Sequence, residues 1–449
     1  MFFGERSLAR TRFSLFPQAP FLHPDRRPEI VTIASPPGTI GPGPSDNRLF
    51  VITPVGKQYA YGLAEGPLGT PFLNLPPWRG PIVPPAFPST EGHFDHIPVD
   101  APQFRQAHLF GTIRFVLEIW ERYLGGPITW HFARHFARLE ASVYPPLDNA
   151  RAGYGYMEAG SHPNDDGSIA DYALNFDVVA HEIGHLIIYS LIGVPRGTIE
   201  QEDYFGFQES AADTAALIAV LHFDSMIEQL LSDTRGNLYA ANELNRFAEL
   251  STTDQIRLAS NSVKMSKFAF GWDDEHDLSE PLTGAIFDIL VDVFQEILVD
   301  RGVVSRRIAE MSDQIRAHPE YEPVIQSAFD AAFARQPQAF WGALEETRDY
   351  LGTALAETWK RLSAQFLSYD DVGRMLLAVD GALTGGRFQA EIFESFDWRE
   401  IGRVRVGPRL KPPDESSHTS SSRTLVPEAG RVLPKMSYRE RALLANVIQ

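Results

Sequence analysis

The sequence predicts an α+β protein with a strand-rich first part, a mainly helical second part and a loose tail. The first hundred residues are rich in proline and glycine and contain short β-type runs, such as EIVTIA at 29–34. From residue 176 onward, apolar residues recur mostly at helical spacing. The stretch KPPDESSHTSSSRTL at 411–425 has the composition of a flexible polar connector.

These changes of character divide the chain into four parts. We expect a Pro/Gly-rich β-type region at 1–99, a mixed first lobe at 100–192, an α-helical second lobe at 193–403 and a flexible polar tail at 404–449. The mixed first lobe opens with apolar residues at helical spacing and Gly125-Gly126 as a stop. Further helices are expected at 177–192, 207–232, 281–300 and in several segments between 303 and 402, and a strand at ASVYPP (141–146).

Composition excludes several classes of partner and site. The formal net charge of −18 argues against binding to nucleic acid or to an anionic membrane. No segment reaches the length of a membrane span, and the basic start lacks a signal-peptide core, so we expect a cytoplasmic protein, with export by a non-classical route as the alternative. The chain has no cysteine, so a metal would need His, Asp or Glu ligands. Nothing in the sequence indicates an oligomeric state.

The stretch FDVVAHEIGHLIIYS places two histidines and a glutamate inside an apolar helix. His181 and His185 are four residues apart, so their imidazoles can point to one metal ion, and Glu182 can reach a water held there. The alternative is a core helix whose polar side chains are satisfied in other ways. Burial of these three groups costs several kcal/mol unless each has a partner, and one metal ion would serve all three.

A catalytic zinc needs a third protein ligand and one open position. Glu209 and Asp213 are again four residues apart on an apolar helix, YFGFQESAADTAALIAVL. Glu209 can complete the ligand set, and Asp213 can accept the free N–H of a liganding histidine. The structural alternative for Glu209 and Asp213 is an ion pair with a distant arginine. Glu202 and Asp203 are rival ligands.

Other candidate metal patterns are weaker. A metzincin would need glycine at 188 and histidine at 191, where the chain has Ile188 and Leu191. NDDG at 164–167 is interpreted as a turn rather than a calcium loop. His131 and His135 also have helical spacing but no intervening glutamate, so we interpret them as surface or core histidines.

Taken together, these segments resemble the thermolysin-like gluzincin metallopeptidases. FDVVAHEIGH followed by FQESAAD is similar to the two zinc-binding helices of that family. Looser similarities are found in DAPQFRQAHLFGTIRFVLEIWERYLGG, DNARAGYGYM, QIRLASN, HDLSEPLTGAIFD and AEIFESFDWREIG. The resemblance covers roughly residues 100–300, and the last of these segments would end the helical lobe. It implies a two-lobed fold with the zinc helix between the lobes.

The resemblance also implies a set of roles. Zinc would be held by His181, His185 and Glu209, with Glu182 as the general base that takes a proton from water and passes it to the departing amine. His276 and, more weakly, Tyr204 would donate to the tetrahedral oxyanion, Arg257 would hold a substrate carbonyl, and Asn149 and Ala150 would dock the peptide as an added strand.

Some of these residues also have structural interpretations. Arg257 is equally consistent with a surface or ion-pairing arginine. His276 can cap the following helix or pair with Asp273, Asp274 or Asp277, and Asn149 can be a turn residue. Asp177 matches a family calcium position whose usual acidic partner would fall near Val220, so calcium binding is doubtful.

The function predicted from the sequence is a zinc endopeptidase acting on peptides or proteins. The first alternative is a non-catalytic zinc-stabilised binding protein, which would have no need of Glu182. The second is an aminopeptidase on a related plan, but no GAMEN-type stretch appears. The family is typically exported with a signal and a propeptide, and neither is visible in this chain.

Overall fold

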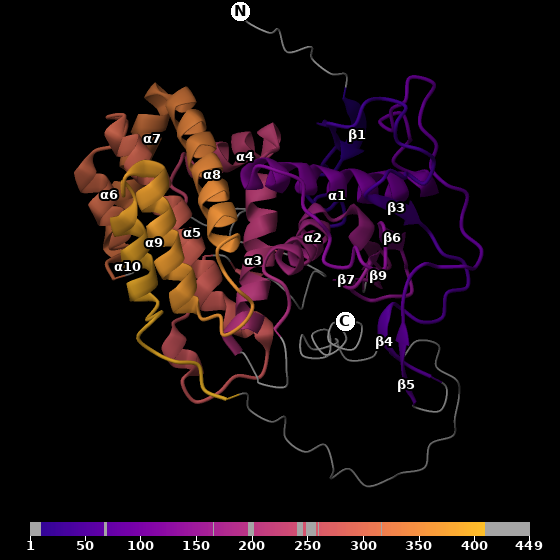
Figure 1. The fold of residues 1–449 in the computed structure, drawn as a ribbon. Coiled ribbons are helices and arrows are strands. Elements are labelled where there is room, and N and C mark those ends of the chain that lie inside the picture. The colour runs from indigo at the N-terminus through magenta and orange to yellow at the C-terminus, as the bar shows by residue number, and fades with distance from the viewer. Residues whose placement is uncertain are drawn as a thin grey trace, which may run out of the picture.

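The computed structural model describes residues 10–66, 70–164, 166–195, 202–239, 246–247, 257–258, 260–315 and 317–408. The chain is α+β, with small sheets mostly in its first part and long helices mostly in its second (Figure 1). The strands are β1 Thr11–Leu15, β2 Glu29–Ile33, β3 Leu49–Ile52, β4 Gly62–Glu65, β5 Pro71–Asn74, β6 Leu139–Val143, β7 Ala150–Ala152, β8 Tyr156–Ala159, β9 Ser161–Pro163, β10 Ile169–Asp171, β11 Arg246–Phe247 and β12 Arg257–Leu258. The helices are α1 Pro102–Leu124, α2 Phe176–Leu191, α3 Glu202–Val220, α4 Asp224–Thr234, α5 Glu275–Asp300, α6 Arg306–Asp313, α7 Glu322–Arg335, α8 Pro337–Trp359, α9 Tyr369–Thr384 and α10 Gln389–Trp398.

The largest sheet among the described residues has four strands in the order β3-β6-β8-β7. β3, β6 and β8 are parallel, and β7 pairs antiparallel with β8 at one edge. The long helix α1 lies between β3 and β6 in sequence and contacts both strands. The remaining strands form two-stranded pairs, which include β1-β2 and β4-β5. The β-type interpretation of 29–34 therefore corresponds to one short strand of a hairpin.

The helix expected at 100–126 is α1. Pro102 stands in its first turn, where a missing N–H costs nothing, and Gly125 ends it in the left-handed conformation with φ of 74°. The helix expected at 177–192 is α2, and the one expected at 281–300 is the second half of α5. The expectation of one helix at 207–232 is wrong, because the chain turns at 221–223 and two helices, α3 and α4, lie on either side.

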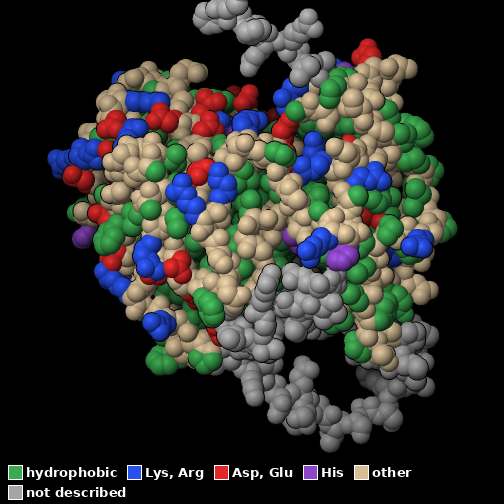
Figure 2. Space-filling model, viewed as in Figure 1, with side chains coloured by type: hydrophobic (Ala, Val, Ile, Leu, Met, Phe, Trp, Pro, Cys, Tyr) green, Lys and Arg blue, Asp and Glu red, His purple; other side chains and the backbone are tan. Residues whose placement is uncertain are grey.

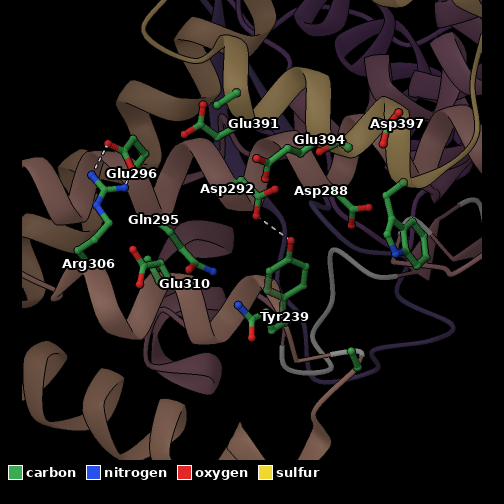
Figure 3. Close-up of a pocket in the computed structure, with 16 residues that line it drawn as sticks. Tyr239, Asp288, Asp292, Gln295, Glu296, Arg306, Glu310, Glu391, Glu394 and Asp397 are labelled. Atoms are coloured by element: carbon green, nitrogen blue, oxygen red, sulfur yellow. Dashed lines mark hydrogen bonds and ion pairs between the residues drawn. The ribbon is translucent and has the colours of Figure 1, made fainter.

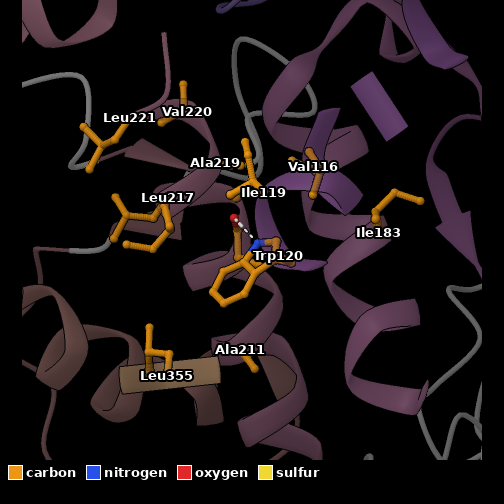
Figure 4. Close-up of a cluster of buried hydrophobic side chains, with 14 of the residues drawn as sticks. Val116, Ile119, Trp120, Ile183, Ala211, Leu217, Ala219, Val220, Leu221 and Leu355 are labelled. Atoms are coloured by element: carbon orange, nitrogen blue, oxygen red, sulfur yellow. Dashed lines mark hydrogen bonds between the residues drawn. The ribbon is translucent and has the colours of Figure 1, made fainter. Parts of the chain in front are cut away.

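One contiguous cluster of buried hydrophobic side chains runs from Phe13 to Ile401. Segments on both sides of the expected boundaries at residues 99 and 192 contribute to it. Trp120 of α1 lies fully buried at its centre, where its indole donates to the carbonyl of Ala215 in α3 over 3.3 Å (Figure 4). Its ring is also 4.6 Å from that of Trp359 in α8, so this one side chain joins three helices.

Figure 1 shows α2 and α3 in the middle of the molecule, with the labelled strands on one side and α5 to α10 on the other. On the face shown in Figure 2, basic and acidic side chains are interspersed over the helical part. No single helix of the described residues is long and apolar enough to cross a membrane, although α3 and α4 together pass the same test with a 94° bend between them.

Candidate metal centre

The helix α2 carries the HExxH segment through the middle of the protein. Asn175 precedes the helix, and its side chain accepts a hydrogen bond from the N–H of Val178, which satisfies one free donor of the first turn. His181, Glu182 and His185 are only 4%, 7% and 1% exposed. Three polar side chains are therefore held in an interior where each needs a partner.

The helix α3 packs closely against α2 and supplies that partner. The two helices are in close contact at Gly184, where an added Cβ would lie 2.8 Å from the Cα of Ala212. Because glycine has no side chain here, the two backbones approach closely enough for α3 to present Glu209 and Asp213 to His181. Both acids are 2% exposed.

His181, His185 and Glu209 form a compact group of possible metal ligands. Glu209 Oε2 is 3.3 Å from His181 Nε2, and Glu209 Oε1 is 3.6 Å from His185 Nε2. Their ligand atoms all lie within 4.8 Å of one another, and no other such group of three occurs in the described part of the chain. Two ligands of a tetrahedral zinc lie about 3.3–3.5 Å apart, given bond lengths of about 2.0–2.2 Å, so the spacing suits a metal.

Each of the two imidazoles has a second contact through Nδ1, the ring nitrogen that does not face Glu209. His181 Nδ1 is 2.8 Å from Asp213 Oδ1, and His185 Nδ1 is 3.4 Å from Gln208 Oε1. The amide of Gln208 in turn donates to the hydroxyl of Tyr204 over 2.9 Å. These contacts direct both Nε2 atoms toward Glu209.

Gln208 is a site residue that the sequence reasoning missed. It is fully buried and directly precedes the acid that completes the ligand group. The available signal was an amide next to Glu209 on an otherwise apolar helix. That signal becomes specific only once α3 is known to lie against His185.

Glu182 has one carboxylate oxygen without a hydrogen-bond partner in the described structure. That oxygen, Oε2, is buried. A buried carboxylate oxygen without a partner is costly, so the arrangement favours an additional group such as a water beside it.

His276 reaches the same centre from the start of α5. Its Nε2 lies 3.3 Å from Glu209 Oε2, and its Nδ1 lies 2.8 Å from Oδ1 of Asp274, the residue that caps α5. The structure thus contains the pairing with an aspartate that the sequence left open, and in addition a contact with Glu209. His276 is not a member of the compact ligand group.

Electrostatics at the centre favour an ionised Glu209. Burial alone would raise the pKa of its carboxyl, but the charges of His276, His185 and His181 and the hydrogen bond from His181 hold the pKa well below its usual value. A deprotonated carboxylate is the form that binds a metal ion.

The rival ligand Asp203 lies in a different environment. Its carboxylate accepts from the backbone N–H of Tyr369 over 3.1 Å. Burial raises the pKa of this acid to about 6, against the opposing effect of that hydrogen bond. Neither Asp203 nor Glu202 belongs to the compact group, which contains Glu209 instead.

Three of the residues expected to contact substrate, Tyr204, Asn149 and Ala150, belong to the described part of the chain with their side chains. Tyr204 is fully buried, and its hydroxyl donates to the carbonyl of Gly193 over 2.6 Å. Ala150 begins β7, the edge strand, and its N–H donates to the side chain of Asn149 over 2.8 Å. Arg257 belongs to β12, and its side chain lies outside the described residues.

The weaker metal patterns adopt other structures. Asn164 and Gly167 close a hydrogen-bonded turn, while Asp165 lies outside the described residues. The segment with His131 and His135 forms turns rather than a helix. His131 packs between the rings of Tyr154 and Tyr189, and burial lowers its pKa to about 3.

The possible calcium position shows no ligand group either. Asp177 lies in the first turn of α2, and Val220, at the end of α3, is buried. Among the described residues, Asp177 is not part of any group of three potential metal ligands.

Comparison of the sequence with known proteins does not assign the chain to a family. Neither a protein-family model nor a curated protein matches the chain.

Proposed function

We propose that the protein is a zinc-dependent endopeptidase with a thermolysin-like two-lobed plan, in which α2 lies between the strand-rich and helical lobes. One observation carries the proposal. Two buried imidazoles and a buried carboxylate converge within 4.8 Å, beside a glutamate whose buried Oε2 has no partner in the described structure. A purely structural metal site would have no use for that glutamate.

The donor set fits zinc. Two imidazole nitrogens and one carboxylate oxygen are the ligands of many catalytic zinc sites, and three protein ligands leave one position open. The chain has no cysteine, so no thiolate competes for the ion. Asp213 and Gln208 hold the two imidazoles in the tautomer that presents Nε2 as a ligand.

A bound zinc would supply Lewis acidity, lowering the pKa of a water molecule and polarising the scissile carbonyl. Glu182 is the residue of this chain suited to take the proton, because its Oε2 is already desolvated and unpaired. It would then deliver that proton to the departing amine nitrogen.

His276 and β7 provide the other functions that peptide hydrolysis needs. The imidazole of His276, oriented by Asp274, would donate a hydrogen bond to the oxygen that becomes negative as water adds. A substrate in extended conformation would add to the sheet at β7, where Asn149 and Ala150 lie at the edge. The substrate class is therefore a polypeptide segment without regular structure.

The test is the variant Glu182→Gln. We expect it to bind one zinc per chain as the parent does, because Glu182 is not a ligand, and to lose peptide hydrolysis by at least about 10²–10⁴-fold, since the base is gone. Zinc content is measured by elemental analysis, and hydrolysis with casein and a quenched fluorescent peptide library. Undiminished cleavage would show that the base is assigned wrongly.

Two controls separate this outcome from contamination and from a non-catalytic site. A chelator should abolish the parent's hydrolysis, and added zinc should restore it. If the parent binds zinc at this centre but cleaves no peptide in the library, the non-catalytic alternative replaces the endopeptidase.

A further inference from the structure

The helical part contains a cavity of about 580 Å³ that is lined largely by polar side chains. Three helices line it: α5 with residues 288, 292, 295 and 296, α6 with 306, 309 and 310, and α10 with 390, 391, 394, 395, 397 and 398 (Figure 3). These positions are three or four apart on each helix, so each set lies on one face. The volume is within the range of small-ligand sites.

The cavity has an excess of negative charge. Seven of its lining residues are acidic and one, Arg306, is basic. Arg306 pairs with Glu296, while Arg399 and Arg403 pair with Asp288 and Asp397. In the described structure, Glu310, Glu391 and Glu394 form no ion pair.

The position of Glu391 shows that these charges interact. Burial raises the pKa of its carboxyl, and the charges of Glu296 and Glu394 raise it further, against the effect of Arg306. Crowded carboxylates repel one another and destabilise the fold unless a cation lies between them.

An independent observation comes from two buried side chains in the lining. Gln295 and Ser395 are 2% and 6% exposed. Gln295 Oε1 and Ser395 Oγ have no hydrogen-bond partner among the described residues, and the same holds for Glu391 Oε2. Each is an acceptor that a ligand with N–H groups would satisfy.

A bare metal ion fits this cavity poorly. Among the described residues, no three of its acids bring ligand atoms within 4.8 Å of one another. The seven acids are instead spread over three helices, α5, α6 and α10. Separated carboxylates match a ligand whose positive charges are also separated.

We propose that this cavity binds a small organic polycation of the linear polyamine type, with ammonium groups paired to Glu310 and Glu391 and N–H groups donated to Gln295 and Ser395. The site is distinct from the metal centre. Asp288 is twelve residues beyond His276 on α5, about 18 Å along the helix, and the rest of the lining of α5 lies further still.

The experiment is calorimetric titration of the full chain with spermidine at low salt. We expect saturable 1:1 binding that weakens as sodium chloride is raised, because the pairing is ionic. The variant Glu310→Gln/Glu391→Gln should lose at least about tenfold in affinity. Its melting temperature should not fall, since two repelling charges are removed.

A matched control removes the same charge elsewhere. Glu228 on α4 and Glu322 on α7 are exposed and do not line the cavity. The variant Glu228→Gln/Glu322→Gln should bind spermidine within about twofold of the parent. Equal losses in the two double variants would show only general attraction to an acidic protein and would overturn the proposal, as would the absence of binding.

Ser395→Ala tests the buried acceptors. If the ligand donates to this hydroxyl, the variant should bind spermidine about threefold to tenfold more weakly. An affinity equal to that of the parent would overturn the proposed contact with α10. Displacement of spermidine by an equal concentration of calcium would show a general cation site instead and would also overturn the proposal.

Discussion

At the scale of single residues, the metal centre depends on the side chains that contact the liganding histidines. Asp213 Oδ1 is 2.8 Å from His181 Nδ1, and both groups are almost fully buried. The carboxylate fixes the orientation and tautomer of the ring and makes its Nε2 a stronger donor to a metal. Its removal should therefore be felt at the metal, although Asp213 is not a ligand.

We expect Asp213→Ala to weaken zinc binding by about 10–100-fold, as outer partners of liganding histidines usually do. Asp213→Asn should lose less, because the amide oxygen can still accept from His181. Affinity is measured by competition with a chromophoric chelator, with circular dichroism as a check of folding. The same zinc affinity in the parent and both variants would argue against this role.

The residues that could be predicted from the sequence are those linked by local spacing. His181 and His185, like Glu209 and Asp213, are four apart, so their common direction follows from helix geometry alone. Gln208 could not be found this way, because its contact with His185 depends on how α3 packs on α2. The unpaired Oε2 of Glu182 is likewise a property of packing rather than of spacing.

At the scale of elements, the centre depends on how closely α2 and α3 approach. Gly184 permits this approach, since a Cβ there would meet Ala212 Cα at 2.8 Å and Ala215 Cβ at 3.1 Å. Any side chain at this position must push the helices apart or distort one of them. The metal ligands on the two helices would then separate.

We expect Gly184→Ala to lower the free energy of unfolding by about 1–3 kcal/mol through overpacking and to weaken zinc binding as well. The control is Gly342→Ala on α8, where the nearest atom to an added Cβ is Arg301 Nη1 at 3.4 Å. Because alanine loses less backbone entropy than glycine when a helix forms, Gly342→Ala should leave the free energy of unfolding unchanged or raise it by about 0.5–1 kcal/mol. Urea unfolding measures both, and equal effects of the two substitutions would contradict the packing argument.

The elements differ in how far the sequence could predict them. α1 and α2 have regular apolar spacing and clear ends, such as Gly125, so their limits were predicted within two residues. The single helix expected at 207–232 is in fact two helices. The turn at 221–223 that separates them could not be predicted, because it contains neither glycine nor proline. It forms where Phe223 turns into the core against Phe115 and Phe176, a long-range contact that no local pattern indicates.

At the scale of the whole molecule, stability depends on distant segments sharing one core. The contact between the rings of Trp120 and Trp359 joins positions 239 residues apart in the sequence. The sequence predicted the α+β class from the change in periodicity, but it gave no indication of such pairings. The hydrophobic contacts between helices are set by shape, and many apolar residues of similar size can fill one position.

Three histidines connect this shared core to pH: His108, which is buried, and His131 and His222, which are half-buried. Burial lowers the pKa of His108 to about 4, and it also lowers the pKa of His131 and His222 to about 3. His108 of α1 is fully buried between two backbone groups: its Nε2 accepts from the N–H of Phe16, and its Nδ1 is 2.9 Å from the carbonyl of Ala173. The neutral ring satisfies both, whereas a second proton would break the bond with Phe16.

It follows that the protein should lose stability in mild acid. The unfolded chain takes up a proton on each histidine near pH 6.5, while the folded protein takes up none at His108 until about pH 4. The stabilisation from neutral His108 is thus fully present above pH 6.5 and is lost as the pH falls to about 4, a change on the order of 3 kcal/mol.

The variant His108→Gln keeps a hydrogen-bond donor and an acceptor but cannot titrate. Between pH 6.5 and 4.5 its unfolding free energy should therefore fall less steeply with pH than that of the parent, and the difference in slope should correspond to the uptake of up to one proton on unfolding. Urea unfolding at a series of pH values gives that slope. The exposed His96→Gln should match the parent, and a parental slope in His108→Gln would refute the assignment.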